Sequence, residues 1–178
     1  MLRGERAAFA ALVDAYRTPI FNLAFRMTGH PSDAEDLAQE TFLRAFEQLP
    51  RFDPERSFYT WLYTISLNLI RNHLKKTGRR RRADFLRGET VTGVVDSAEG
   101  PTVLQGSRNG GELRKEREEG LARCLQKLSP ELRELLVLRF YQGLSFELIA
   151  EIAGLSQSAV KMRVYRGLDK LRKCMEEM

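Results

Sequence analysis

The chain has 178 residues but only two cysteines, two histidines and one tryptophan, and these scarcities exclude several kinds of site. Cys124 and Cys174 lie far apart and outside any Cys-x-x-Cys pair, so we expect two separate reduced thiols rather than a disulfide or a zinc site. His30 and His73 are isolated as well. No nucleophile–base pair, glycine-rich phosphate loop or paired-carboxylate motif stands out. The sequence therefore predicts no enzymatic activity, no metal and no other cofactor.

Long apolar runs are also missing. No stretch approaches the ~18–20 apolar residues needed to cross a bilayer. The first residues, Met1 to Glu5, carry an early acid and lack the apolar core of a secretion signal. We therefore expect a cytoplasmic chain without membrane insertion. A hydrophobic fraction of 43% and a charged fraction of 30% are typical of folded globular proteins.

The net charge of +5 is modest, but the charges are unevenly distributed. Between residues 156 and 173, Asp169 is the single acid among six cations: Lys161, Arg163, Arg166, Lys170, Arg172 and Lys173. A second basic cluster lies within residues 75–82, whereas acids gather at residues 33–36 and 116–119. Clustered cations are the electrostatic signature expected of a surface that meets a nucleic acid.

Hydrophobic periodicity divides the chain into three parts. Residues 5–76 and 112–178 repeat apolar residues at the spacing of amphipathic helices. Residues 77–111 show no sustained period and contain Gly78, Gly88, Gly93, Gly100, Gly106, Gly110 and Gly111. Such a segment buries too little apolar surface to offset its ordering entropy. The sequence predicts an all-α protein in which two small helical domains are joined by a flexible linker.

Local signals set the helix boundaries in residues 5–76. A first helix should break or kink at Pro19 and end at Gly29. Ser32 and Glu35 form a Ser-x-x-Glu capping box for a second helix that runs to about residue 49. Ser57 then caps a longer third helix, which should end near residue 76.

Residues 112–178 carry the signals of a helix-turn-helix. After a helix over residues 113–128, Ser129 and Pro130 supply an N-cap followed by proline at the first helical position. Ser145 and Ser156 cap the last two helices, and Gly154 lies in the turn between them. This spacing is typical of a DNA-binding helix-turn-helix.

A helical wheel gives the second helix a core face and an acidic face. The core face contains Ala34, Leu37, Ala38, Thr41, Phe42, Ala45 and Leu49, and the opposite face contains Asp36, Gln39, Glu40, Leu43 and Glu47. An acidic helix face is most often simply solvated. The apolar Leu43 among the acids counts slightly against this interpretation, because a mixed apolar and acidic strip is what a basic helical partner would bind.

The third helix is apolar on two sides, which predicts that it is wedged into a bundle. A narrow polar stripe separates these sides and contains Ser57, Thr60, Thr64, Asn68, Arg71 and Lys75. Uncharged hydrogen-bonding groups that end in two cations suit nucleotide bases at one end and phosphates at the other. Phe52, Tyr59 and Tyr63 lie where they can stack on bases. The alternative is that the aromatic residues here are core residues, which we expect for Trp61 and Phe58, whereas both interpretations stand for Phe52 in its proline-flanked loop.

The last helix also has two faces. Val160, Val164, Leu168 and Leu171 face inward, whereas Ser158, Lys161, Met162, Tyr165 and Arg166 gather on the opposite side. The first turns of such a helix enter the major groove of DNA, where lysine and arginine bond to guanine edges or phosphates. A basic surface helix in an unrelated bundle remains the alternative.

Three segments, in this order, resemble the extracytoplasmic-function (ECF) sigma factors, the compact branch of the major bacterial sigma family. Residues 33–46 resemble that family's polymerase-binding helix. Residues 58–63, with Asn68, Arg71 and Asn72, resemble its helix for the −10 promoter element. Residues 144–171 resemble its helix-turn-helix for the −35 element. The resemblance covers nearly all of the chain except the linker.

The resemblance implies a protein that binds core RNA polymerase and directs it to promoters. Residues 5–76 would form sigma region 2, residues 77–111 a linker that threads toward the polymerase active site, and residues 112–178 sigma region 4. The implied partners are core polymerase, through its β′ clamp coiled coil and β subunit, promoter DNA, and an anti-sigma factor that holds the chain inactive.

The same resemblance assigns roles to individual residues. Asp36, Gln39, Glu40 and Leu43 would bind core polymerase; Phe52, Tyr63, Thr64, Asn68, Arg71 and Asn72 would bind the −10 element; Ser158, Lys161, Met162, Tyr165 and Arg166 would bind the −35 element. One base of the −10 element would be flipped into a pocket near Phe52.

Two other functions fit the sequence without the resemblance. A conventional regulator would bind operators through the C-terminal helices and use the first domain to dimerise or to sense a signal. A helical scaffold or RNA-binding protein would carry the same basic clusters as solvated surface. Dependence on core polymerase separates the first of these from a sigma factor, and the salt dependence of DNA binding separates the second.

Overall fold

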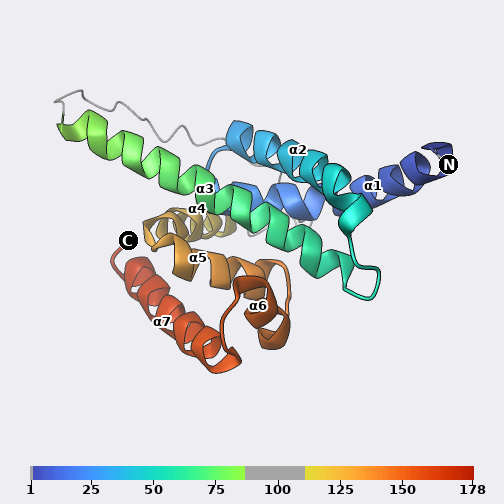
Figure 1. Cartoon of the computed structure of the whole chain (residues 1–178). Coiled ribbons are helices and arrows are strands. Elements are labelled where there is room, and N and C mark those ends of the chain that lie inside the picture. The colour runs from blue at the N-terminus through green and yellow to red at the C-terminus, as the bar shows by residue number, and fades with distance from the viewer. Residues whose placement is uncertain (1, 87–110) are drawn as a thin grey trace.

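The computed structural model describes the backbone of residues 2–86 and 111–178, and in this part of the chain helices joined by short loops are present, without a strand. The elements are α1 (Leu2–Thr28), α2 (Pro31–Gln48), the short 3₁₀ helix η1 (Leu49–Arg51), α3 (Phe58–Leu86), α4 (Gly111–Lys127), α5 (Pro130–Leu136), the π-helical turn η2 (Val137–Tyr141), α6 (Phe146–Ala153) and α7 (Gln157–Glu176). Figure 1 shows α1 and α2 in the upper part of the molecule, α3 running diagonally across it, and α5, α6 and α7 in the lower part. The predicted all-α fold is confirmed.

The first half of the molecule is a three-helix unit. The helix α2 packs on α1 and α3, and its buried residues are Ala34, Leu37, Ala38, Thr41 and Ala45, all predicted from the wheel. The helix α1 continues through Pro19 without a break and ends at Gly29. Gly29 adopts a φ of 79° while its N–H donates to the carbonyl of Phe25 at 2.8 Å. A positive φ of this kind is strained for residues with a side chain, which explains why glycine ends the helix.

The predicted capping box at Ser32 is wrong. The helix α2 begins at Pro31, and its N-cap is His30, whose backbone is extended (φ −124°, ψ 124°). The fixed φ and missing N–H of proline suit the first helical position. The helix therefore starts before Ser32, which lies inside its first turn and cannot act as the N-cap.

The helix α3 is wedged between the two halves, as its two apolar sides predict. Leu62, Leu67 and Ile70 are fully buried on it. One side packs against α1 and α2, and another against α6. Its end differs from the prediction, because α3 continues past residue 76 to Leu86. Residues 77–86 are thus helix rather than linker, and the remaining predicted linker, residues 87–110, lies outside the described residues.

The second half contains the helix-turn-helix that the sequence predicts. Ser145 Oγ accepts from Leu148 N–H at 3.2 Å, and Ser156 Oγ accepts from Ala159 N–H at 3.2 Å, so both serines cap the helices α6 and α7. Gly154 makes the turn between them with a φ of 66°. Each side-chain cap satisfies a backbone donor that the first turn of a helix otherwise leaves unpaired.

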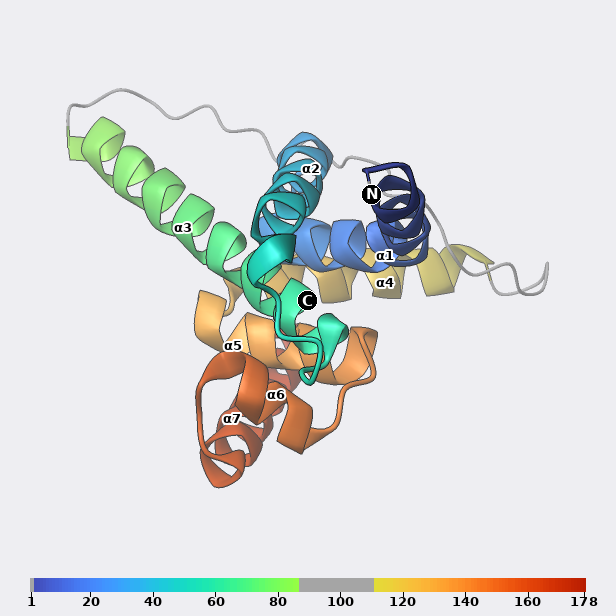
Figure 2. The ribbon, with the colours of Figure 1, turned by 45° about the vertical axis from the view of Figure 1, so that its right-hand side comes forward.

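The two halves pack against one another. Buried residues of both halves form one hydrophobic cluster, to which Ile20 and Leu67 of the first half and Ile149 of the second belong. The helix α1 contacts α4, α5 and η2, and α3 contacts α6. Figure 2 shows α4 running beneath α1 and α5 beneath α3. We call this packing of the two halves the closed arrangement.

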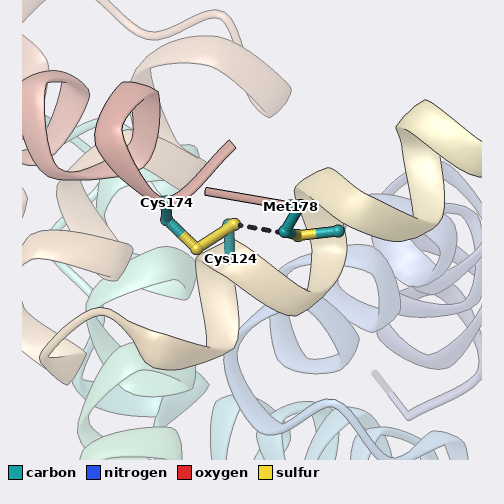
Figure 3. Close-up of a disulfide and its surroundings, with 3 residues drawn as sticks. All are labelled: Cys124, Cys174 and Met178. Atoms are coloured by element: carbon teal, nitrogen blue, oxygen red, sulfur yellow. Dashed lines mark hydrogen bonds between the residues drawn. A yellow bond between two sulfur atoms is a disulfide. The ribbon is translucent and has the colours of Figure 1, made fainter. Parts of the chain in front are cut away.

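The expectation of two separate thiols is wrong. Cys124 of α4 and Cys174 of α7 are joined by a disulfide, with their Cα atoms 5.8 Å apart (Figure 3). The two cysteines are 50 residues apart in the sequence. Sequence distance carries no information about this pair, because the packing of α7 against α4 brings them together. No helix in the described ranges is both long and apolar enough to span a bilayer.

Candidate nucleic-acid and protein interfaces

The outward face of α2 presents acids and apolar groups to solvent. Asp36 and Gln39 are exposed, and the side chain of Leu43 is 61% exposed despite being aliphatic. Glu40 is half-buried, and its Oε1 accepts from Nε of Arg44 at 2.7 Å. The four residues predicted to bind a protein partner therefore share one accessible surface.

Sequence reasoning missed Phe46 on this surface. Phe46 is 45% exposed, and its ring meets that of Phe9 edge-on with centroids 5.1 Å apart. Its position three residues after Leu43 was a readable signal, because residues at i and i+3 share a helix face. Two exposed large apolar side chains beside carboxylates form the kind of patch that marks a protein-binding site.

Phe52 lies in the loop between η1 and α3, where it joins an aromatic cluster. Its ring centroid is 4.8 Å from that of Trp61 and 5.7 Å from that of Phe58. All three side chains are half-buried. The cluster holds Phe52 in place at the start of α3 and leaves part of its ring accessible.

Tyr63 is not accessible in the closed arrangement. Tyr63 is only 1% exposed. Its hydroxyl donates to Oε1 of Gln142, a residue of the second half, at 2.7 Å. Its ring stacks on that of Tyr59 with centroids 4.2 Å apart. Burial raises the pKa of Tyr63 well above its ordinary value, so the phenol stays protonated and keeps its role as donor.

Arg71 is also engaged by the second half. Its Nε and Nη2 donate to the two carboxylate oxygens of Glu134 at 2.8 and 2.6 Å. Glu134 itself is only 5% exposed. These hydrogen bonds raise the pKa of Arg71 above its ordinary value, although partial burial acts to lower this pKa. Two-point pairing with a planar carboxylate uses the same donors that would bind a phosphate.

The other predicted −10 residues lie on the accessible part of α3. Asn68 and Asn72 are exposed, and Asn68 Oδ1 accepts from Nη1 of Arg71 at 3.4 Å. Thr64 is half-buried and donates from Oγ1 to the carbonyl of Thr60 at 2.8 Å. The structure therefore places the six predicted −10 residues within residues 52–72. Asn68 and Asn72 are open to a ligand, whereas Tyr63 is buried and Arg71 is paired with Glu134.

The outward face of α7 is open. Ser158, Lys161, Met162, Tyr165 and Arg166 are all exposed, as the wheel predicts. Met162 is 65% and Tyr165 62% exposed, whereas Val160 and Val164 on the inner side are buried. The helix α7 lies at the opposite end of the molecule from α2 (Figure 1). Cationic, apolar and hydroxyl groups at the start of an exposed helix can bond to base edges, thymine methyl groups and phosphates.

A buried arginine joins the two halves, and no local pattern predicts it. Arg133 is 6% exposed and donates to the carbonyls of Met27, Leu125, Gln126 and Leu128. These carbonyls lie at the C-terminal ends of α1 and α4, where helix dipoles favour a cation. Burial lowers the pKa of Arg133 to about 10. Nearby, the guanidinium of Arg26 lies 3.5 Å from the ring centroid of Tyr141.

Comparison with known proteins identifies the family. Residues 12–80 match the model of Sigma-70 region 2, and residues 124–173 match that of Sigma-70 region 4. The RNA polymerase sigma-H factor of Pseudomonas aeruginosa is 32% identical over 99% of this chain and 90% of its own length. The ECF RNA polymerase sigma factor SigW of Bacillus subtilis is 33% identical over 99% of this chain and 93% of its own. The chain belongs to the ECF sigma factors.

Solved structures agree with this assignment. CnrH, solved in complex with the cytosolic domain of CnrY, has a TM-score of 0.68 and 28% identity over 97% of this chain and 90% of its own. The sigma factor RpoE of Bartonella quintana shares the fold, with a TM-score of 0.67 at 23% identity over 95% of this chain and 97% of its own. The ECF sigma factors are transcription initiation factors, not enzymes. The region 2 match spans the α2 face and most of α3, and the region 4 match spans the helix-turn-helix.

Proposed function

We propose that this ECF sigma factor binds core RNA polymerase through the outward face of α2 and recognises promoters through α3 and α7. The observation that best supports this proposal is that the chain has two separate exposed surfaces of different chemistry. One is acidic and apolar, around Asp36 and Leu43, and the other is cationic, around Lys161 and Arg166. Neither surface is used to build the core. Membership of the family supports polymerase as the partner of the first and DNA as the partner of the second.

Finer assignments follow the family pattern. The β′ clamp coiled coil is the proposed partner of Asp36, Gln39, Glu40 and Leu43, because a basic helical partner complements an acidic and apolar strip. Residues 5–76 would act as region 2 and residues 112–178 as region 4, with the segment between them following the polymerase surface past its β subunit. The protein would act in the cytoplasm, where the polymerase is.

Promoter binding requires the closed arrangement to open. Tyr63 and Arg71 are proposed to hold the −10 element, yet Gln142 and Glu134 occupy them. A base and a phosphate can reach these side chains only after the second half has moved away. We infer that the closed arrangement is the inactive state of the chain and that core polymerase binds the open one.

An anti-sigma factor is the proposed negative regulator. The related RpoE was solved in a complex with an anti-sigma factor, and CnrH in a complex with the cytosolic domain of another protein. The exposed apolar side chains of α2 offer such a regulator a binding surface. A regulator bound there would compete directly with polymerase.

Transcription with purified core polymerase tests the proposed function. The expected result is transcripts that start at defined sites and require the added protein. A conventional regulator would instead bind operators tightly by itself and be indifferent to core enzyme. A scaffold would show DNA binding that hardly changes with salt. Either of these results, without protein-dependent start sites, rejects the proposal.

Alanine at both Asp36 and Gln39 should weaken binding to core polymerase at least about tenfold, because polar anchors at an interface commonly contribute 1–3 kcal/mol together. The fold should be unaffected, since both side chains are exposed. Fluorescence anisotropy of the labelled protein with core enzyme measures the affinity. The matched control is Asp14→Ala with Gln48→Ala, which removes the same two residue types from exposed positions outside this face of α2. Equal affinities for the two double variants would exclude this surface.

Alanine at both Lys161 and Arg166 should weaken binding to −35 DNA by roughly tenfold to several hundredfold, because a good contact to a guanine contributes about 1–3 kcal/mol. Where phosphate contacts are lost, the log–log salt slope should fall by about 0.9 for each. A filter-binding series over increasing salt measures both quantities. Arg163→Ala serves as control, because it removes a cation from the same helix outside this face. A loss no larger than that of the control would exclude α7 as the reading helix.

A further inference from the structure

Cys124 and Cys174 occupy places that suit a redox-active pair. Cys124 is fully buried in α4, whereas Cys174 on α7 is half-buried (Figure 3). Their Cα atoms are 5.8 Å apart, within the range that a disulfide spans without movement of the backbone. Cys174 is therefore the more accessible residue of the pair, and Cys124 is held next to it.

The surroundings of the pair are rich in sulfur and closely packed. Sδ of Met178 lies 3.5 Å from Sγ of Cys124. A side chain at Gly120, one turn before Cys124, would meet the methyl group of Met178 at 3.0 Å. Met175 of α7 and Met178 at the C-terminus thus lie directly against α4 at Gly120. This packing places the two cysteines next to one another.

A permanent structural disulfide does not fit a protein that works with RNA polymerase. In a reducing cytoplasm, persistent disulfides are rare, and those that form are mostly transient and redox-sensing. The second half also contributes many apolar residues to the core that it forms with the first half, with Leu135, Leu138 and Ile149 almost fully buried. It does not have the small, disulfide-dependent core of a secreted domain.

We propose that Cys124 and Cys174 form a reversible redox switch that low-molecular-weight disulfides oxidise. The thiolate of Cys174 attacks one sulfur of the small disulfide and releases one small thiolate, leaving a mixed disulfide. The thiolate of Cys124 then attacks the sulfur of Cys174 and releases the second small thiolate. One S–S bond is broken and one is formed overall, and the two cysteine protons pass to the two released thiolates. Excess small thiol reverses both steps.

The bond connects the recognition helix to the contact between the two halves. It fixes the C-terminal part of α7 to α4, and α4 in turn contacts α1. Nε2 of Gln126 on α4 donates to the carbonyl of Arg26 at 3.0 Å, and Arg133 binds carbonyls of both helices. Holding α4 in place preorganises this contact, so the oxidised chain favours the closed arrangement. This regulatory step rests on the proposed function, in which the closed arrangement is inactive.

The chemical part is tested on the purified full chain without polymerase. The protein is equilibrated anaerobically with mixtures of oxidised and reduced glutathione, and the remaining thiols are trapped with iodoacetamide and counted by mass spectrometry. We expect one two-electron transition between a dithiol and an internal disulfide, reversed by reduced glutathione in the native state. Cys174→Ser and Cys124→Ala should each abolish the internal bond. Failure to form it at any ratio, or failure to reverse it, would overturn the switch.

The structural and regulatory parts use the oxidised and reduced forms side by side. The oxidised chain should unfold at a temperature about 5–15 °C higher, and Cys174→Ser should show no such difference. With core polymerase, the reduced form should give about fivefold more promoter transcript than the oxidised form, and Cys174→Ser should be insensitive to redox state. Equal transcription from both forms would overturn the regulation, even with a reversible bond. Absence of transcription from every form would instead reject the proposed function and leave the thiol result standing.

Discussion

Replacing Arg133 with alanine is expected to lower the free energy of unfolding by about 3 kcal/mol. The buried guanidinium donates hydrogen bonds to carbonyls at the ends of both α1 and α4, and its loss leaves several of these carbonyls without a donor. A buried acceptor that loses its partner costs about 1–3 kcal/mol, and part of this is recovered because a buried cation no longer has to be accommodated. Urea denaturation followed by circular dichroism measures the difference.

Two further variants separate the role of Arg133 from a general effect of charge. Arg133→Lys keeps the cation but cannot reach both helix ends at once, so its loss should be intermediate. Arg123→Ala removes an exposed arginine from α4 and should change the stability by less than about 0.5 kcal/mol. If Arg133→Ala behaves like Arg123→Ala, the guanidinium does not hold the two halves together.

Replacing Glu134 with glutamine is expected to strengthen binding of the free chain to single-stranded −10 DNA about tenfold. The carboxylate neutralises Arg71 across the interface, with two hydrogen bonds of 2.8 and 2.6 Å. Breaking a buried ion pair destabilises the state that contains it by up to about 3–5 kcal/mol. We expect less here, because a third of the Arg71 side chain is exposed. The open state then gains population, and affinity rises in proportion to the competent fraction.

The matched control is Glu131→Gln. Glu131 lies on the same helix and is exposed, so this substitution makes the same change in net charge without touching Arg71. Anisotropy with a fluorescent strand from a mapped promoter reports affinity, and small-angle scattering reports opening through the radius of gyration. If the two glutamine variants agree in both measurements, the Arg71–Glu134 pair does not restrain the chain.

The helix faces were predictable from sequence because they depend on local periodicity. The wheel placed Ala34 and Leu37 inside and Leu43 outside, and the structure confirms each of them. The caps at Ser145 and Ser156 were predictable for a similar reason, since a short side chain bonds within its own turn. At Ser32 the prediction of a side-chain cap was wrong, because the helix begins one residue earlier, at Pro31.

The remaining features depend on contacts between distant parts of the chain. Nothing near Arg133 in the sequence indicates that carbonyls of α1 will surround it, and the spacing of Cys124 and Cys174 does not reveal that their helices pack together. The residues proposed for the −10 element were found from α3, the loop before it and the family resemblance. Their partners Gln142 and Glu134 come from the other half, so the closed arrangement could not be predicted from either segment separately.

The outward face of α7 has an evolutionary consequence. Val160 and Val164 hold the helix in the core, whereas Met162 and Tyr165 are more than half exposed. Substitutions at such exposed positions usually change stability by less than about 0.5 kcal/mol. A duplicated copy of the gene could therefore exchange these side chains and acquire new target sites, while its fold and its attachment to the transcription machinery stayed intact.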